Sequence, residues 1–162
     1  MSFSILRRSI WPSAPDFGVD VYELGLAVKY VYGGAEDRFQ SFAQLMGSPD
    51  AFLWFTPNDL LPDVGFFPVP EGLVIACAGT TSLRQFWNQI LYADVRPAPD
   101  FDNNWIASFW AWAYNEMAFN VPENIRWGGD GRKIVLVGHS YGAIMCQLAA
   151  YQLAKQFPPE DI

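Results

Sequence analysis

The feature that most constrains this chain is a long apolar stretch interrupted by one short run of small and polar residues. The branched apolar residues 134–137 predict a buried strand, and the Ala-, Leu- and Gln-rich segment 143–157 predicts a helix. Between them, residues 138–142 have the sequence Gly-His-Ser-Tyr-Gly, which matches the pattern G-x-S-x-G. In this pattern a strand turns sharply into a helix, and the turn holds the serine in a strained conformation with its hydroxyl exposed. We therefore predict that Ser140 is a catalytic nucleophile.

The two glycines of this motif have a steric role in the prediction. Because Gly138 and Gly142 lack Cβ atoms, the strand and the helix can pass close together on either side of Ser140. Ser140 then lies at the helix N-terminus, where free N–H groups can stabilise a developing oxyanion. The alternative interpretation is a glycine-rich strand-to-helix turn that binds nothing.

Composition narrows the class of protein. The chain has 162 residues, of which 51% are hydrophobic and 17% aromatic, so we expect one globular domain, 1–162. The net charge of −7 argues against nucleic acid as a partner, because no basic stripe is present to neutralise phosphates. No apolar run is long enough for a transmembrane segment, and the first residues lack the continuous apolar segment of a signal peptide. These features favour a cytoplasmic location.

Two cysteines are too few for a disulfide framework. Cys77 lies on a predicted strand and Cys146 on the helix after the motif, so we expect buried free thiols, with a single disulfide as the alternative. We expect no metal site and no cofactor.

Hydrophobic patterns elsewhere predict the elements around the motif. Amphipathic helices are expected at 19–32 and 39–46, and short strands at 51–55 and 64–67. A second continuous apolar run, 73–78, predicts another strand buried on both faces.

The two continuous apolar runs are expected to be parallel neighbours, 73–78 beside 134–137. Parallel pairing needs a long crossover, and the chain between the runs is long enough to supply one. Within it we expect a loop at 97–104 and a helix at 105–119 that packs on the sheet, because this segment is apolar nearly throughout.

A second turn of small residues follows the strand predicted at 73–78. Gly79-Thr80 is placed to supply one N–H of an oxyanion hole, because serine hydrolases take one donor from a loop after an earlier strand. The other interpretation is a helix cap formed by Thr80, Thr81 or Ser82. Both interpretations can hold at once.

Three segments, taken in order, resemble the class 3 (fungal-type) triacylglycerol lipase family. Residues 74–87 are similar to the family's strand, oxyanion turn and lid start, V-x-F-R-G-[ST]-x-S followed by an aromatic residue. Residues 105–114 occupy the place of a segment with a Gly-Phe pair, and residues 135–143 are similar to the elbow G-H-S-L-G-G. The resemblance implies an α/β-hydrolase fold with a mostly parallel sheet flanked by helices, here incomplete at the C-terminus.

The same resemblance implies a function and its residues. The expected reaction is hydrolysis of acylglycerols, similar lipid esters or small esters. Ser140 would be the nucleophile, and Thr80 and Tyr141 would hold the oxyanion through their backbone N–H groups. Residues 83–87 would begin a lid-like helix over the acyl pocket. The sequence departs from the family pattern in four places, with Ala78 for Arg, Ser108 for Gly, Tyr141 for Leu and Ala143 for Gly.

The chain has a single histidine, and it stands beside the nucleophile. In this fold a carboxylate and then a histidine follow the serine. Neighbouring residues at a sharp turn point in different directions, so His139 is not expected to act as the base for Ser140. We therefore expect an N-terminal portion of a hydrolase whose triad Asp and His come from a C-terminal complement. The alternative is a non-catalytic α/β-hydrolase-like binding or assembly module.

Overall fold

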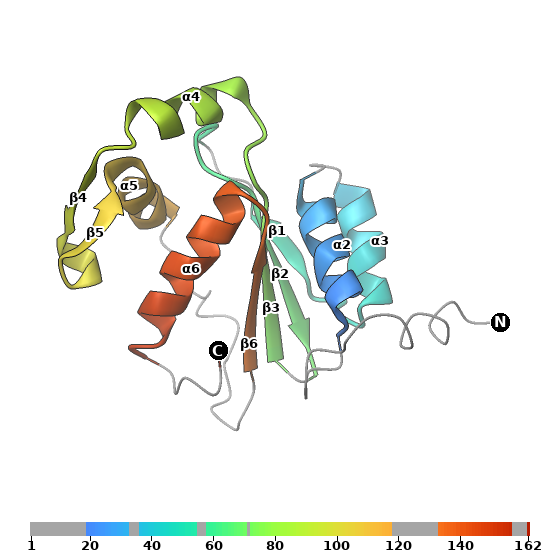
Figure 1. Cartoon of the computed structure of the whole chain (residues 1–162). Coiled ribbons are helices and arrows are strands. Elements are labelled where there is room, and N and C mark those ends of the chain that lie inside the picture. Colours follow the sequence, from blue (N-terminus) through green and yellow to red (C-terminus); the bar gives the residue numbers. More distant parts are fainter. Residues whose placement is uncertain (1–18, 33–35, 55–57, 71, 118–132, 157–161) are drawn as a thin grey trace.

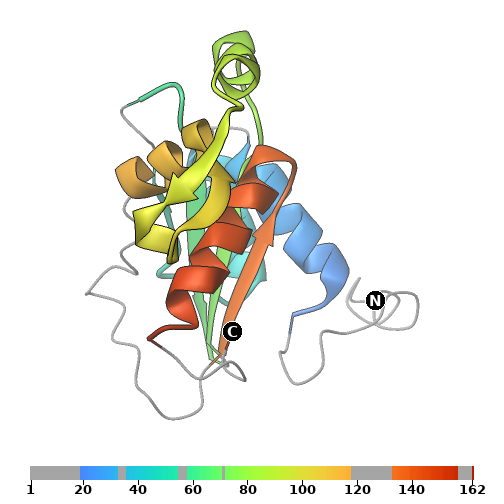
Figure 2. The same ribbon diagram turned by 60° about the vertical axis from the view of Figure 1, so that its left-hand side comes forward.

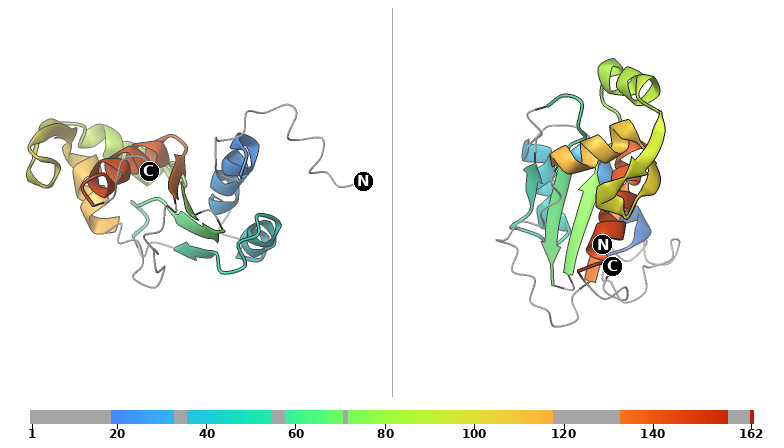
Figure 3. Two further views of the ribbon diagram at one scale, coloured as in Figure 1. Left: turned by 90° about the horizontal axis from the view of Figure 1, so that it is seen from below. Right: turned by 90° about the vertical axis from the view of Figure 1, so that its left-hand side faces the viewer.

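The structure of the protein is a computed structural model. It describes residues 19–32, 36–54, 58–70, 72–117, 133–156 and 162. In this part of the chain a sheet forms the middle of three layers (Figures 1 and 3). The helices α2 (Val21–Val31) and α3 (Glu36–Leu45) cover one face. On the other face lie α5 (Ser108–Met117) and α6 (Tyr141–Leu153).

The sheet is mixed rather than mostly parallel. Among the described residues its strand order is β1-β2-β3-β6, with β1 Phe52–Trp54, β2 Val64–Val69, β3 Gly72–Cys77 and β6 Lys133–Gly138. The pairs β1–β2 and β2–β3 are antiparallel, and only β3–β6 is parallel. The expected mostly parallel sheet is therefore wrong for this part of the chain. Connection length is the physical reason, since β2 and β3 are joined by a short hairpin turn, which permits only antiparallel pairing.

The predicted parallel pair is confirmed. Residues pair in register from Leu73 with Ile134 to Cys77 with Gly138, so both strands end at the same edge of the sheet. Side chains of β3 alternate between two cores: Val74 and Ala76 lie under α2 and α3, whereas the odd-numbered residues face α5 and α6. This burial on both faces explains the continuous apolar run.

The crossover between these strands differs from the prediction in its middle. After α4 (Leu83–Leu91), the strands β4 (Val95–Ala98) and β5 (Asn104–Ala107) form an antiparallel hairpin, closed by the short 3-10 helix η1 (Pro99–Phe101). The expected loop at 97–104 and helix at 105–119 are thus partly wrong, because Trp105 lies on a strand and α5 begins at Ser108. Residues 118–119 lie outside the described part.

The hairpin reverses through two residues with left-handed backbone conformations. Asp102 and Asn103 have φ angles of 55° and 59°, which Asp and Asn adopt more readily than other non-glycine residues. Their tolerance of this conformation allows β5 to turn back along β4 before the chain enters α5. Figure 2 shows the hairpin lying beside α6.

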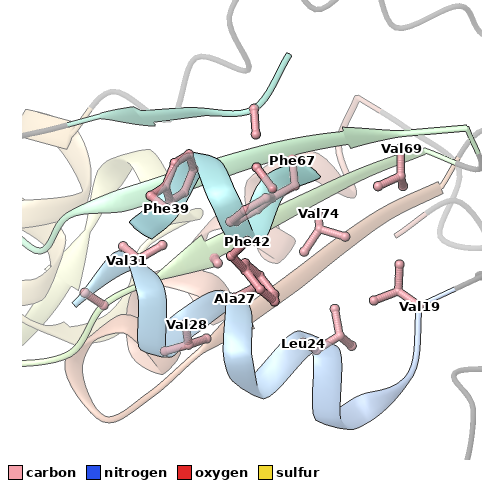
Figure 4. Packing of buried hydrophobic residues seen from close by; sticks show 14 residues of the cluster. Val19, Leu24, Ala27, Val28, Val31, Phe39, Phe42, Phe67, Val69 and Val74 are labelled. Atoms are coloured by element: carbon pink, nitrogen blue, oxygen red, sulfur yellow. The ribbon is translucent and has the colours of Figure 1, made fainter. Parts of the chain in front are cut away.

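Aliphatic side chains and three phenylalanines fill the core between the sheet and the helix pair α2–α3 (Figure 4). The ring of Phe67 on β2 packs against Phe39, with centroids 4.9 Å apart, and edge-on against Phe42. α2 starts with a capping box in which the Asp20 carboxylate accepts the Glu23 N–H and the Glu23 carboxylate accepts the Asp20 N–H. This cap sets where α2 begins. The last turn of α2 lies at the edge of the sheet where β3 and β6 end (Figure 1).

Two expectations from composition are tested by the structure. Cys77 and Cys146 are buried and free, as predicted. Burial, together with a hydrogen bond between the two thiols, raises the pKa of Cys77 well above its ordinary value, the contact with Cys146 being the larger cause. Across the described segments, no helix combines the length and the hydropathy needed to cross a membrane.

Candidate active site

Ser140 lies at the predicted strand-to-helix turn. β6 ends at Gly138 and α6 begins at Tyr141, and Ser140 between them has φ 52° and ψ −118°. A positive φ is uncommon for a residue with a Cβ and costs about 1–3 kcal/mol, so surrounding contacts must impose it. The Ser140 residue is exposed, and its side chain forms no capping bond to α6, which leaves the hydroxyl available.

The contacts that impose this turn are steric. A Cβ at Gly138 would lie 2.5 Å from the carbonyl group of Gly142, and a Cβ at Gly142 would overlap the backbone oxygens of Cys77 and Ala78. β6, α6 and the end of β3 therefore meet with no space for a side chain at either glycine. This crowding gives a physical reason for glycine at both positions of the motif.

The turn after β3 packs directly against this elbow. A Cβ at Gly79 would lie 2.6 Å from the His139 carbonyl oxygen, and the His139 N–H donates to the Cys77 carbonyl over 3.4 Å. Both turns follow strands that end at the same sheet edge, which is where open α/β sheets place their ligands. The structure thus brings the segments of Thr80 and Ser140 together.

Polar side chains from α4 hold the turn that contains Thr80. Ser82 is the N-cap of α4 and accepts the Gln85 N–H. Of the predicted cap candidates Thr80, Thr81 and Ser82, the cap is therefore Ser82. The Gln85 side chain is 1% exposed, accepts the Thr81 N–H over 2.6 Å and donates to the Leu61 carbonyl over 3.0 Å. Gln89 donates to the Thr80 hydroxyl over 2.9 Å. Sequence reasoning missed both glutamines, although a glutamine beside a Thr-Thr-Ser turn is a usable signal.

The backbone N–H of Tyr141 is the first in α6, and the first N–H groups of a helix have no intrahelical acceptor. The Tyr141 side chain points into the core, where its phenol donates to the Leu60 carbonyl over 3.4 Å and its ring packs on Phe109. Burial raises the pKa of this phenol, so it stays protonated. Tyr141 thus anchors the start of α6 through its side chain while its N–H remains at the turn.

The single histidine forms a hydrogen bond with the residue that ends α2. His139 Nδ1 lies 2.8 Å from the hydroxyl of Tyr32, the residue that ends α2. Burial raises the pKa of Tyr32, and an interaction with the Gly79 backbone partly offsets that rise. Tyr32 was not singled out from the sequence, and no local pattern marks it, because the contact joins residues 107 positions apart.

An apolar cavity lies between α4 and α5. Its volume is about 320 Å³. The lining residues are Leu60, Asn88, Tyr92, Ser108, Phe109 and Trp112. Two of them, Leu60 and Phe109, also contact the Tyr141 side chain, so the cavity adjoins the residue after Ser140. Apolar pockets with a few polar groups are typical small-molecule sites.

Comparison with known protein families adds an independent result. Residues 74–162, more than half of the chain, match the sequence model of the family Lipase (class 3). The chain belongs to the class 3 lipase family. The matched region begins in β3 and contains the turn at Thr80, the helix α4, the elbow at Ser140 and all of the cavity's lining residues except Leu60. No protein of curated function and no solved structure matches the chain.

Membership in this family indicates a hydrolase of the lipase or esterase type, and the family's substrates are lipid esters. The matched region excludes α2 and with it Tyr32. No group of three or more His, Cys, Asp or Glu side chains placed to hold a metal occurs among the described residues.

Proposed function

We propose that this chain carries the nucleophile and oxyanion hole of a serine carboxylic-ester hydrolase, which cleaves acylglycerols or similar lipid esters through an acyl-enzyme. One observation carries the proposal: the strained Ser140 turn at the start of α6 packs against the turn of Gly79 and Thr80. Family membership supports the reaction class. The polypeptide is then part of an α/β-hydrolase fold.

In the proposed reaction Ser140 Oγ attacks the ester carbonyl carbon and transfers its proton to a base. The N–H groups of Thr80 and Tyr141 stabilise the negative charge on the carbonyl oxygen. The protonated base donates to the leaving alkoxide, and water then hydrolyses the acyl-enzyme by the same steps. Each oxyanion donor contributes about 3 kcal/mol to lowering the barrier.

The cavity between α4 and α5 is proposed to receive the acyl chain. Its lining is apolar, and it adjoins Tyr141, whose N–H is one proposed oxyanion donor. α4 contributes Asn88 to the lining of this cavity and would act as the lid-like helix. It lies at the outside of the molecule (Figure 1).

The base is proposed to come from outside these 162 residues. A serine at its ordinary pKa is a weak nucleophile and needs an adjacent base. His139 is the only histidine of the sequence, and its Nδ1 is engaged by the Tyr32 hydroxyl. We infer that a C-terminal complement brings the triad Asp and His, and that it pairs with β6, which is an edge strand in the described sheet. An unpaired edge offers free N–H and C=O groups to such a segment.

The test is hydrolysis of a short-chain p-nitrophenyl ester by the purified chain, alone and with its native C-terminal segment added in trans. We expect no turnover from the chain alone, and hydrolysis that depends on Ser140 after complementation. Ser140→Ala is the variant, and Ser41→Ala on the exposed surface of α3 is the matched control. Turnover by the chain alone, lost in Ser140→Ala, would contradict the assignment of the base.

A second candidate function is a non-catalytic binding or assembly module. The engagement of the only histidine by Tyr32 is the observation that favours it. Light scattering separates the two candidates. The proposed enzyme portion has an open β6 edge and should self-associate, whereas a stable monomer that complementation does not activate supports the module.

A further inference from the structure

The hydroxyl of Tyr32 lies where the two turns of the candidate active site meet. Tyr32 comes from the end of α2, in the layer opposite to α6, and it lies outside the region that matches the family. Its oxygen occupies the space beside Gly79 into which a Cβ would project. The same oxygen is 2.8 Å from Nδ1 of His139, the residue before Ser140. One hydroxyl therefore touches both turns.

The hydrogen-bonding capacity of a phenol suits this position. A tyrosine hydroxyl has one hydrogen to donate and accepts through its lone pairs. The Tyr32 oxygen also lies against the Gly79 backbone, and their interaction lowers the pKa of the phenol, which partly offsets the rise caused by burial. Over the 2.8 Å contact the hydroxyl donates to His139 Nδ1 when that nitrogen carries no hydrogen, and accepts from it when it carries one.

We propose that Tyr32 is a positioning residue that joins the turn of Gly79 and Thr80 to the elbow of Ser140 and sets the distance between them. The inference rests on the proposed function, in which Thr80 and Tyr141 donate to one oxyanion from separate turns. Those turns belong to different strands, and the hydroxyl adds a link between them on the α2 side. Donors must be held within about 0.5 Å of the productive geometry.

This role differs from simple packing of α2. The Tyr32 and His139 rings are tilted by 56° with centroids 5.9 Å apart, so ring packing alone would survive removal of the hydroxyl. Tyr32→Phe keeps the ring and deletes only the bridging oxygen. Tyr30→Phe is the matched control, because Tyr30 lies on the same helix and stacks on Phe42 at 4.7 Å, away from both turns.

The first measurement uses the ¹⁵N-labelled chain, in which the single histidine makes the imidazole signals unambiguous. We expect one arrangement of the wild-type His139 ring, with a single set of ring-nitrogen signals, because the Tyr32 hydroxyl holds Nδ1. Tyr32→Phe should give a mixture of tautomers, shift the amide signals of Gly79 and Thr80, and speed Gly79 amide exchange about fivefold to tenfold, the effect of one hydrogen bond. Tyr30→Phe should change none of these. Unchanged His139 and Gly79 signals in Tyr32→Phe would overturn the proposal.

The second measurement uses the complemented enzyme. Loss of positioning should lower kcat about tenfold or more and leave KM within about twofold, because the misplaced donors act on the transition state. A change in KM alone, or no change, would also overturn the proposal. If the wild-type protein does not hydrolyse esters, the proposed function fails, and the His139 and Gly79 signals still decide whether Tyr32 links the turns.

Discussion

The two helices that follow the parallel strands are held in opposite ways. α6 follows β6 and buries one side of its length, including Tyr141, Met145 and Ala149. α4 follows β3 and buries only Gln85, while its apolar side chains face outwards, with Leu83 78% and Leu91 70% exposed. α6 starts at a strained residue without a side-chain cap, whereas α4 starts at a capped serine.

This difference shows two physical means of fixing a turn at the end of a strand. The Ser140 turn is fixed by close packing of backbone on backbone, which glycine alone allows. The Thr80 turn is fixed by hydrogen bonds from glutamine side chains, and its helix contributes little to the core. Packing contacts cannot relax without moving a strand, so we expect α6 to be rigid. α4 can move if a few hydrogen bonds break, as a lid requires.

The largest effect is expected at the packed turn. Gly142→Ala should lower the free energy of unfolding by about 3 kcal/mol or more, because the new methyl group would overlap the backbone oxygens of Cys77 and Ala78. Urea unfolding measures the change. Gly25→Ala is the control, since nothing lies within 4 Å of a Cβ there. Gly25 is at an exposed position of the helix α2, where alanine should stabilise the protein by up to about 1 kcal/mol. A cost for Gly142→Ala below that of an ordinary surface change would refute close packing at the elbow.

A smaller loss is expected at Gln85. Gln85→Ala deletes the side-chain bonds to the Thr81 N–H and to the Leu61 carbonyl, and losing a hydrogen bond at a buried site costs about 1–3 kcal/mol. We expect a destabilisation of about 2 kcal/mol by urea unfolding. Gln44→Ala on the exposed surface of α3 should be neutral within about 0.5 kcal/mol. Equal results for both glutamines would show that hydrogen bonds do not hold the Thr80 turn.

The capping serine of α4 should contribute less again. Ser82→Ala removes the acceptor for the Gln85 N–H and should cost about 1 kcal/mol, the usual value of an N-cap. Because α4 contributes little to the core, the loss should appear as faster amide exchange within α4 rather than as a lower midpoint for the whole chain. An equal rise in exchange within α6 would show that the two helices open as one unit.

The smallest effect on stability is expected on the outer face of α4. Leu91→Gln replaces an exposed side chain and should change the free energy of unfolding by no more than about 0.5 kcal/mol. Its matched comparison is Leu153→Gln, which places an amide in the core on α6 and should cost several times more. Thermal melts of the two variants measure the difference. Similar losses would mean that α4 is covered by another surface in solution.

Local sequence patterns predicted the elements that the site depends on. The apolar run before Gly138 and the Ala- and Leu-rich run after Gly142 require a strand, a sharp turn and a helix, because the period of side-chain burial and the lack of Cβ atoms act within a few residues. The same local reasoning predicted α2, α3 and the parallel pair β3–β6, whose continuous apolar sequence suits burial on two faces. The two parallel strands that end at the Ser140 turn and the Thr80 turn could therefore be predicted from short-range patterns.

Tertiary structure alone decided the rest. The antiparallel pairing of β2 with β3 and the hairpin around Asp102 arise from connection geometry, which an apolar pattern does not encode. The placement of Tyr32 against His139 depends on α2 docking across the sheet, a contact between residues 107 positions apart. Side-chain periodicity reports which face of an element is buried, and only the packed layers determine which distant residue it meets there.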